Sequence, residues 1–137
     1  MFYETIDDIT ADAGVRVRAK TLEELICKVL LATFNEITDI SCISINEEYI
    51  IEVGSVLPFM LADIINQALA VHEKYNFIAR ECEVLYLDKE RLKVKLKGGK
   101  FDPEVNEPKL LIKAATYHRL NIEHKEGVYE AEVVFDI

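Results

Sequence analysis

Two helical stretches in this chain are too apolar to lie on a protein surface, and they constrain the fold more than any other feature. Apolar residues with helical spacing follow Thr21: Leu22, Leu25, Ile26, Val29 and Ala32, widened by Leu30, Phe34 and Ile37. A second stripe runs through Leu57, Leu61, Ile64, Ala68, Val71 and Tyr75, beside a row of Met60, Ile65 and Leu69. Both helices must therefore be enclosed by the rest of the chain.

Each helix carries its own boundary signals. Thr21 and Glu24 have the spacing of a capping box, so the first helix is expected to begin there and to end near Thr38. Pro58 is acceptable only in the first turn of a helix, which places the second helix from about Pro58 to Asn76.

Apolar and β-branched runs before, between and after the helices predict strands. We expect strands at 2–6, 13–19, 40–45, 49–53, 77–87, 91–97, 110–124 and 128–137, with hairpin turns at 46–48, 88–90 and 125–127. Residues 98–109 form the one extended loop. This order predicts an α+β fold: a single two-layer domain over residues 1–137, with a curved, mainly antiparallel sheet packed around the two hydrophobic helices.

Composition narrows the class of protein. The chain has 137 residues, enough for one domain with an ordinary core, and 16 basic against 25 acidic residues give a net charge of −9. That charge disfavours tight, direct binding of nucleic acid. The chain has no run long enough to cross a membrane, and its N-terminus is too acidic for a signal peptide, so we expect a cytoplasmic protein that does not associate with membranes.

Four cations interrupt the acidic character on one predicted strand. Arg91, Lys93, Lys95 and Lys97 alternate with apolar residues and so share one strand face. Such a face is either simply solvated or in contact with RNA or an acidic partner, and both interpretations stay open.

Cysteine and histidine residues provide no zinc site. Cys27, Cys42 and Cys82 are odd in number, widely spaced and surrounded by apolar neighbours, so we expect all three in the core. They cannot be combined with the histidines into a zinc-binding pattern; the histidines are His72, His118 and His124. His72 is expected at the edge of the core. The chain also lacks phosphate-binding glycine loops and nucleophile motifs, so catalysis finds little support.

The final strand suggests a binding site of a different kind. Its alternating apolar residues continue to Ile137, which predicts a chain end held within a sheet. Asp136 and the α-carboxylate of Ile137 would then present hard oxygen donors that suit Ca²⁺ or Mg²⁺. If Asp12 joined them, each pair of charges would repel by about 4 kcal/mol at 4 Å, and a divalent cation would relieve this repulsion. The alternatives are a solvated chain end and a simple turn at Asp12.

Several segments together resemble the archease family. They are Thr10-Ala-Asp-Ala-Gly-Val15, Lys20-Thr-Leu-Glu-Glu24, Lys113-Ala-Ala-Thr-Tyr-His-Arg-Leu120 and the terminal Val133-Val-Phe-Asp-Ile137. The resemblance covers the whole chain. One departure is Ile9, where the family usually has a histidine, so any role of that histidine is in doubt here.

The resemblance implies a function. It implies a non-catalytic protein cofactor that activates an RtcB-type RNA ligase in tRNA splicing, by promoting GTP-dependent guanylylation and multiple turnover. It also implies a divalent-metal site, with Ca²⁺ first and Mg²⁺ or Mn²⁺ as alternatives, formed by Asp12, Asp136 and Ile137. Lys113 and His118 become candidate partner contacts; a strand-face lysine and a hydrogen-bonded core histidine are the alternatives.

Two other functions stay in view. The same family has been proposed to act as a chaperone-like modulator of tRNA-modifying enzymes such as a tRNA methyltransferase, which would depend on exposed apolar patches. A metal-dependent hydrolase is the third alternative, and it lacks an identifiable general base.

Overall fold

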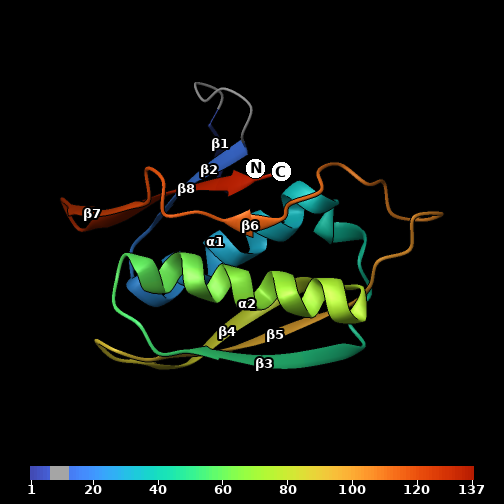
Figure 1. Cartoon of the computed structure of the whole chain (residues 1–137), viewed down its shortest axis with the longest axis horizontal. Helices are drawn as coiled ribbons and strands as arrows, with labels where there is room; N and C mark the ends of the chain where they lie inside the picture. Colours follow the sequence, from blue (N-terminus) through green and yellow to red (C-terminus); the bar gives the residue numbers. More distant parts are fainter. Residues whose placement is uncertain (7–12) are drawn as a thin grey trace.

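The computed structural model describes residues 1–6 and 13–137. Within these ranges, helices α1 (Leu22–Ile37) and α2 (Phe59–Tyr75) lie between two antiparallel sheets (Figure 1). This confirms an α+β domain in which antiparallel strands enclose two hydrophobic helices. The strands are divided between two sheets, one on each side of the helices, where the sequence suggested one curved sheet in two layers.

The first sheet is organised around the last strand, β8 (Val128–Asp136). On one side, β8 pairs along its length with β2 (Ala13–Ala19), which also pairs with the short β1 (Glu4–Thr5). On its other side, β8 pairs with β6 (Ala114–Ala115) and β7 (Asn121–Lys125). The predicted turn between β7 and β8 is confirmed, because Glu126 and Gly127 both have positive φ, as a two-residue hairpin loop requires.

The second sheet has β5 (Leu92–Lys100) at its centre, with β3 (Glu47–Val53) and β4 (Phe77–Leu87) beside it. The predicted hairpin between β4 and β5 is confirmed. Asp88 stabilises its turn, because the Asp88 carboxylate accepts from the Glu90 amide at 2.8 Å.

The helices form where the sequence predicts them. The Thr21 hydroxyl accepts from the Glu24 amide at 3.1 Å, which caps α1, while the Glu24 carboxylate pairs with Lys28. Asn76 ends α2 in a left-handed conformation. The core lies where both helices meet the sheets; its largest fully buried side chains include Phe34, Phe77, Phe135, Leu25, Ile26, Leu30, Met60, Leu61, Ile64 and Ile65.

The prediction of a strand at 40–45 is wrong. Residues Ile40–Cys42 form a 3₁₀ turn, since the Asp39 carboxylate accepts from the Ser41 amide at 3.0 Å and starts it. The predicted hairpin is therefore not made. Instead β3 pairs with β5, which lies much later in the chain.

The boundaries around the predicted loop also differ. Strand β5 continues through Gly98 and Gly99 to Lys100, so the loop begins later than expected. A Cβ on Gly98 would lie 1.8 Å from the Ile78 carbonyl oxygen, so only glycine permits this close strand pairing. Residues 110–124 form only β6 and β7. The amides of Lys109 and Leu110 instead bond the last carbonyls of α1, those of Ile37 and Glu36.

The cysteine prediction is wrong as well. Cys27 of α1 and Cys82 of β4 form a disulfide, with their Cα atoms 5.4 Å apart, and Cys42 is free and exposed. Apolar neighbours in the sequence indicated burial, but they could not show that α1 lies against β4. Among the helices described, none is long and apolar enough to cross a membrane.

Candidate functional site

The candidate site lies at the C-terminal end of β8, where three chain segments meet. Ala13 is opposite Phe135 on one side of β8, and Ala114 is opposite Asp136 on the other. The Lys113 amide donates to the Asp136 carbonyl at 2.7 Å. The C-terminal end of β8 thus brings together a segment near the start of the chain and the segment around Lys113.

The predicted metal ligands lie partly within the described residues. Asp136 is exposed, and Ile137 has 42% of its surface exposed, so both residues reach solvent at the end of β8. Asp12 and Ile9 lie outside the described residues, although Asp12 is joined directly to Ala13. Within 1–6 and 13–137, no group of three or more His, Cys, Asp or Glu side chains could hold a metal ion. A site here would need Asp12 and a main-chain oxygen.

Lys113 and His118, the candidate partner contacts, both have exposed side chains. His118 lies in the turn from Tyr117 to Leu120, where the Leu120 amide bonds the Tyr117 carbonyl at 3.2 Å. The interpretation of His118 as a core histidine is therefore wrong, because the strand predicted over 110–124 breaks at this turn.

The segment from Lys113 to Tyr117 is fixed from both sides. Towards β8, the amide and the hydroxyl of Thr116 both bond the Val134 carbonyl at 2.9 Å. Towards α2, the Asn66 side chain accepts from the Ala115 amide at 2.8 Å and donates to the Ala115 carbonyl at 3.1 Å. Asn66 thus takes the place of a neighbouring strand for β6.

Tyr117 provides a second attachment to α2. Its hydroxyl donates to the Asp63 carboxylate at 2.6 Å, and its ring meets the Phe59 ring edge-on at 4.9 Å. The pKa of the Tyr117 phenol is raised because its proton is held by the Asp63 carboxylate.

Sequence reasoning missed Asn66 and Asp63. They stand three residues apart in a mostly apolar helix, so they share one helix face. Two polar residues at this spacing were the available signal.

The cationic strand face lies between two acidic strands. In the β3–β5 register Lys93 is opposite Glu52 and Lys97 opposite Glu48, and on β4 Glu83 is opposite Lys95. The guanidinium of Arg91 pairs with Glu52 at 2.9 Å. Because opposite charges adjoin along the whole face, it presents no unbroken positive stripe to a phosphate backbone.

The outer face of the first sheet is also balanced in charge. Arg16 pairs with Glu132 at 2.6 Å, and Arg18 pairs with Glu4 at 2.6 Å and with Glu130 at 2.5 Å. These residues are opposite or diagonal neighbours across β1, β2 and β8. Such exposed pairs contribute about 0–1 kcal/mol each, and their main effect is to fix strand register.

His72 has a structural environment, as expected from its sequence context. It is half-buried, its Nδ1 lies 2.9 Å from the Phe77 carbonyl oxygen, and its ring is 6.3 Å from that of Phe34. Both contacts belong to the edge of the core.

Sequence comparisons identify the relatives of this chain. The profile of the Archease protein family (MTH1598/TM1083) matches residues 3–137. The chain is 35% identical over 133 residues to the protein archease of Pyrococcus abyssi, covering 93% of this chain and 94% of that protein. It is 37% identical over 133 residues to the protein archease of Pyrococcus furiosus, with the same coverage.

Solved structures share the fold. The solution structure of Methanobacterium thermoautotrophicum protein 1598 matches with a TM-score of 0.80 and 27% identity, covering 99% of both chains. A crystal structure from Thermotoga maritima, described as an archease and possible chaperone, matches with a TM-score of 0.65 and 22% identity, over 94% of this chain and 93% of that one. Together, the profile match and the relatives show that this chain belongs to the archease family.

Proposed function

We propose that this protein is a non-catalytic cofactor that activates an RtcB-type RNA ligase in tRNA splicing, by promoting guanylylation of the ligase and its multiple turnover. The observation that carries the proposal is the meeting of three segments at the end of β8. Ala13, Asp136 and Lys113 are adjacent there in the strand register or through a backbone bond. These are the segments that carry the family-like sequence motifs.

The proposed metal site consists of Asp12, Asp136 and the main-chain carboxylate of Ile137. Asp136 supplies an exposed carboxylate at an open strand end, and such oxygen donors suit Ca²⁺, with Mg²⁺ or Mn²⁺ as alternatives. A bound cation would supply positive charge where carboxylates crowd together. The pairing of β8 with β2 and β6 would hold Asp136 in place for the cation.

The partner contacts would lie beside this site. Lys113 and His118 are exposed on the segment that Asn66 and Thr116 fix in place, so little ordering would be needed when a ligase docks.

Ligase turnover tests this proposal. The purified RtcB-type ligase would be assayed with GTP and a tRNA-half substrate, with wild-type protein or with Asp12→Asn, Asp136→Asn or Glu126→Gln. We expect the two site variants to lower stimulation by roughly tenfold or more, as loss of metal ligands or their supports does. Glu126→Gln changes the net charge equally at a distant exposed turn and should retain stimulation. Full stimulation by Asp136→Asn would contradict the metal site.

A chaperone-like modulator of tRNA-modifying enzymes, such as a tRNA methyltransferase, is the second candidate. It is favoured by exposed apolar side chains on the loop before β6, with Val105 73% and Leu111 76% exposed. Adding residues after Ile137 discriminates between the two functions. The extension should abolish a function that depends on the terminal carboxylate, and it should leave one that depends on Val105 and Leu111 intact.

A further inference from the structure

A polar groove lies beside the first turns of α2, away from the end of β8. It is lined by Glu52, Val53, Gly54, Ser55, Asp63, Asn66 and Gln67 and has a volume of about 400 Å³. We call it the α2 groove. Asp63 contributes a carboxylate to this lining, whereas the Glu52 carboxylate pairs with Arg91, and the lining residues include no cationic side chain.

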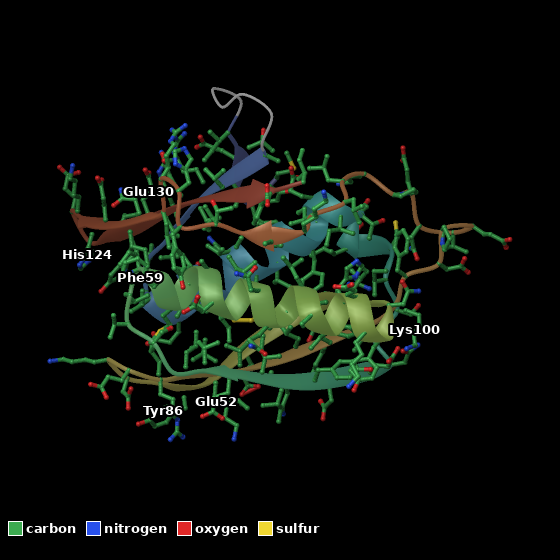
Figure 2. All side chains as sticks on the ribbon, in the orientation of Figure 1. Glu52, Phe59, Tyr86, Lys100, His124 and Glu130 are labelled. Atoms are coloured by element: carbon green, nitrogen blue, oxygen red, sulfur yellow. A yellow bond between two sulfur atoms is a disulfide. The ribbon has the colours of Figure 1, made fainter. Side chains whose placement is uncertain are left out.

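An apolar rim borders the α2 groove. Val56, Phe59 and Tyr117 have 49%, 45% and 56% of their surfaces exposed, and Figure 2 shows Phe59 at the start of α2. The hydrogen bond from Tyr117 to Asp63 joins this rim to the groove. Exposed aromatic side chains are typical of protein interfaces, where aromatic residues and arginine are enriched.

Hydrogen-bonding capacity in the groove is incompletely used. The Ser55 hydroxyl is buried and has no hydrogen-bond partner among the described residues. The bond from Tyr117 reaches Oδ1 of Asp63, and a carboxylate has two oxygens that together accept several bonds. A donor on a ligand can therefore bond the Asp63 oxygen that Tyr117 does not use.

We propose that the α2 groove is a docking surface for an arginine side chain of a partner protein. A guanidinium group can bond the Asp63 carboxylate while its plane lies against the Tyr117 or Phe59 ring. Net charge supports a basic partner, because a chain of charge −9 repels acidic ones.

The chain itself contains an example of this recognition. Arg91 pairs with Glu52 at 2.9 Å, while its guanidinium carbon lies 4.7 Å from the centre of the Tyr86 ring. A carboxylate and an aromatic ring therefore hold one arginine on the outer face of the second sheet. Asp63 with Tyr117 and Phe59 offers the same combination of a carboxylate and an aromatic ring.

The groove is also held rigid before any partner binds. Asn66 bonds both backbone groups of Ala115, and Tyr117 is fixed through Asp63. A preformed site loses less conformational entropy on binding. The proposal goes beyond the proposed ligase activation, since none of its contacts uses Asp12, Asp136 or Ile137.

The test is an NMR titration of the full chain with the peptide acetyl-Gly-Arg-Gly-amide, compared with the uncharged citrulline peptide of the same shape. We expect amide shifts concentrated at Val56, Phe59, Asp63 and Tyr117 for the arginine peptide. The citrulline peptide should bind roughly tenfold more weakly or worse, because it lacks the charge-assisted bond.

Three variants make the test specific. Asp63→Asn should weaken arginine-peptide binding roughly tenfold, and Phe59→Ala should weaken it several-fold while leaving the charge unchanged. Glu73→Gln, an exposed position on the same helix, should bind as wild type does. Equal binding of both peptides, equal loss in Glu73→Gln, or full binding by Asp63→Asn would overturn the proposal.

Discussion

The disulfide between Cys27 and Cys82 provides the sharpest prediction about stability. It joins α1 to β4 across a sequence separation of 55 residues. In the chain-entropy description, opening a loop of that length adds about 14 cal/mol/K to the unfolded chain, which is about 4 kcal/mol at 25 °C. Replacing both cysteines by serine should therefore lower the free energy of unfolding by about that amount.

The assay is urea and thermal unfolding of oxidised wild type, reduced wild type, the double variant Cys27→Ser/Cys82→Ser, and Cys42→Ser. For a chain of 137 residues, about 4 kcal/mol corresponds to a fall in Tm of roughly 10–15 °C. Cys42 is free and exposed, so Cys42→Ser should unfold as wild type does, with or without reductant. Equal stability of oxidised and reduced wild type, or an equal loss in Cys42→Ser, would refute the reasoning.

Three further predictions concern the strands, the core and the α2 contacts. Gly98→Ala should destabilise the fold by more than about 2 kcal/mol in urea unfolding, because its Cβ would collide with backbone, whereas Gly54→Ala meets nothing closer than 3.8 Å and should be tolerated. Phe34→Ala removes a fully buried ring and should cost about 3–5 kcal/mol in the same assay. The folded pKa of Tyr117 is raised by Asp63, so the stability from this bond is present below the unfolded pKa near 10 and is lost as pH rises through the folded pKa. The pKa values of Tyr3, Tyr49 and Tyr86 are also raised, so absorbance titration of tyrosinate should show one late-titrating phenol fewer in Asp63→Asn than in wild type.

Periodicity within single segments predicted most of the elements. The helix starting after Thr21, the helix ending at Asn76 and the strand 13–19 lie where their local patterns indicate. Capping and apolar spacing act between residues three or four apart, so the printed sequence contains the whole signal.

The same reasoning failed where a hydrogen bond to another part of the chain, near or distant, outweighed the apolar pattern. Residues 40–45 have an apolar run typical of a strand, yet Asp39 starts a 3₁₀ turn there. In residues 110–112, Leu110 bonds the end of α1, Leu111 is exposed and Ile112 is buried, although their composition indicated a strand. Apolar content alone does not determine which backbone groups a segment will bond.

For the candidate site, the strand register and a backbone hydrogen bond bring Asp136 and the segment around Lys113 together. Asp12 lies outside the described residues, so the complete ligand set stays a prediction. Asn66 and Asp63 were not foreseen, because their importance depends on Ala115 and Tyr117 in another part of the chain.

The sequence by itself determined the two enclosed helices, the final strand and the family of this protein, because each depends on spacing within a short stretch or on motifs that can be compared directly. Only the tertiary structure decided the division into two sheets, the attachment of β6 to α2 and the disulfide. Those features join residues that are far apart in the sequence. Asn66 and Ala115 are 49 positions apart, and Cys27 and Cys82 are 55 positions apart. Pairings at such separations depend on how whole elements pack, and no local pattern encodes them.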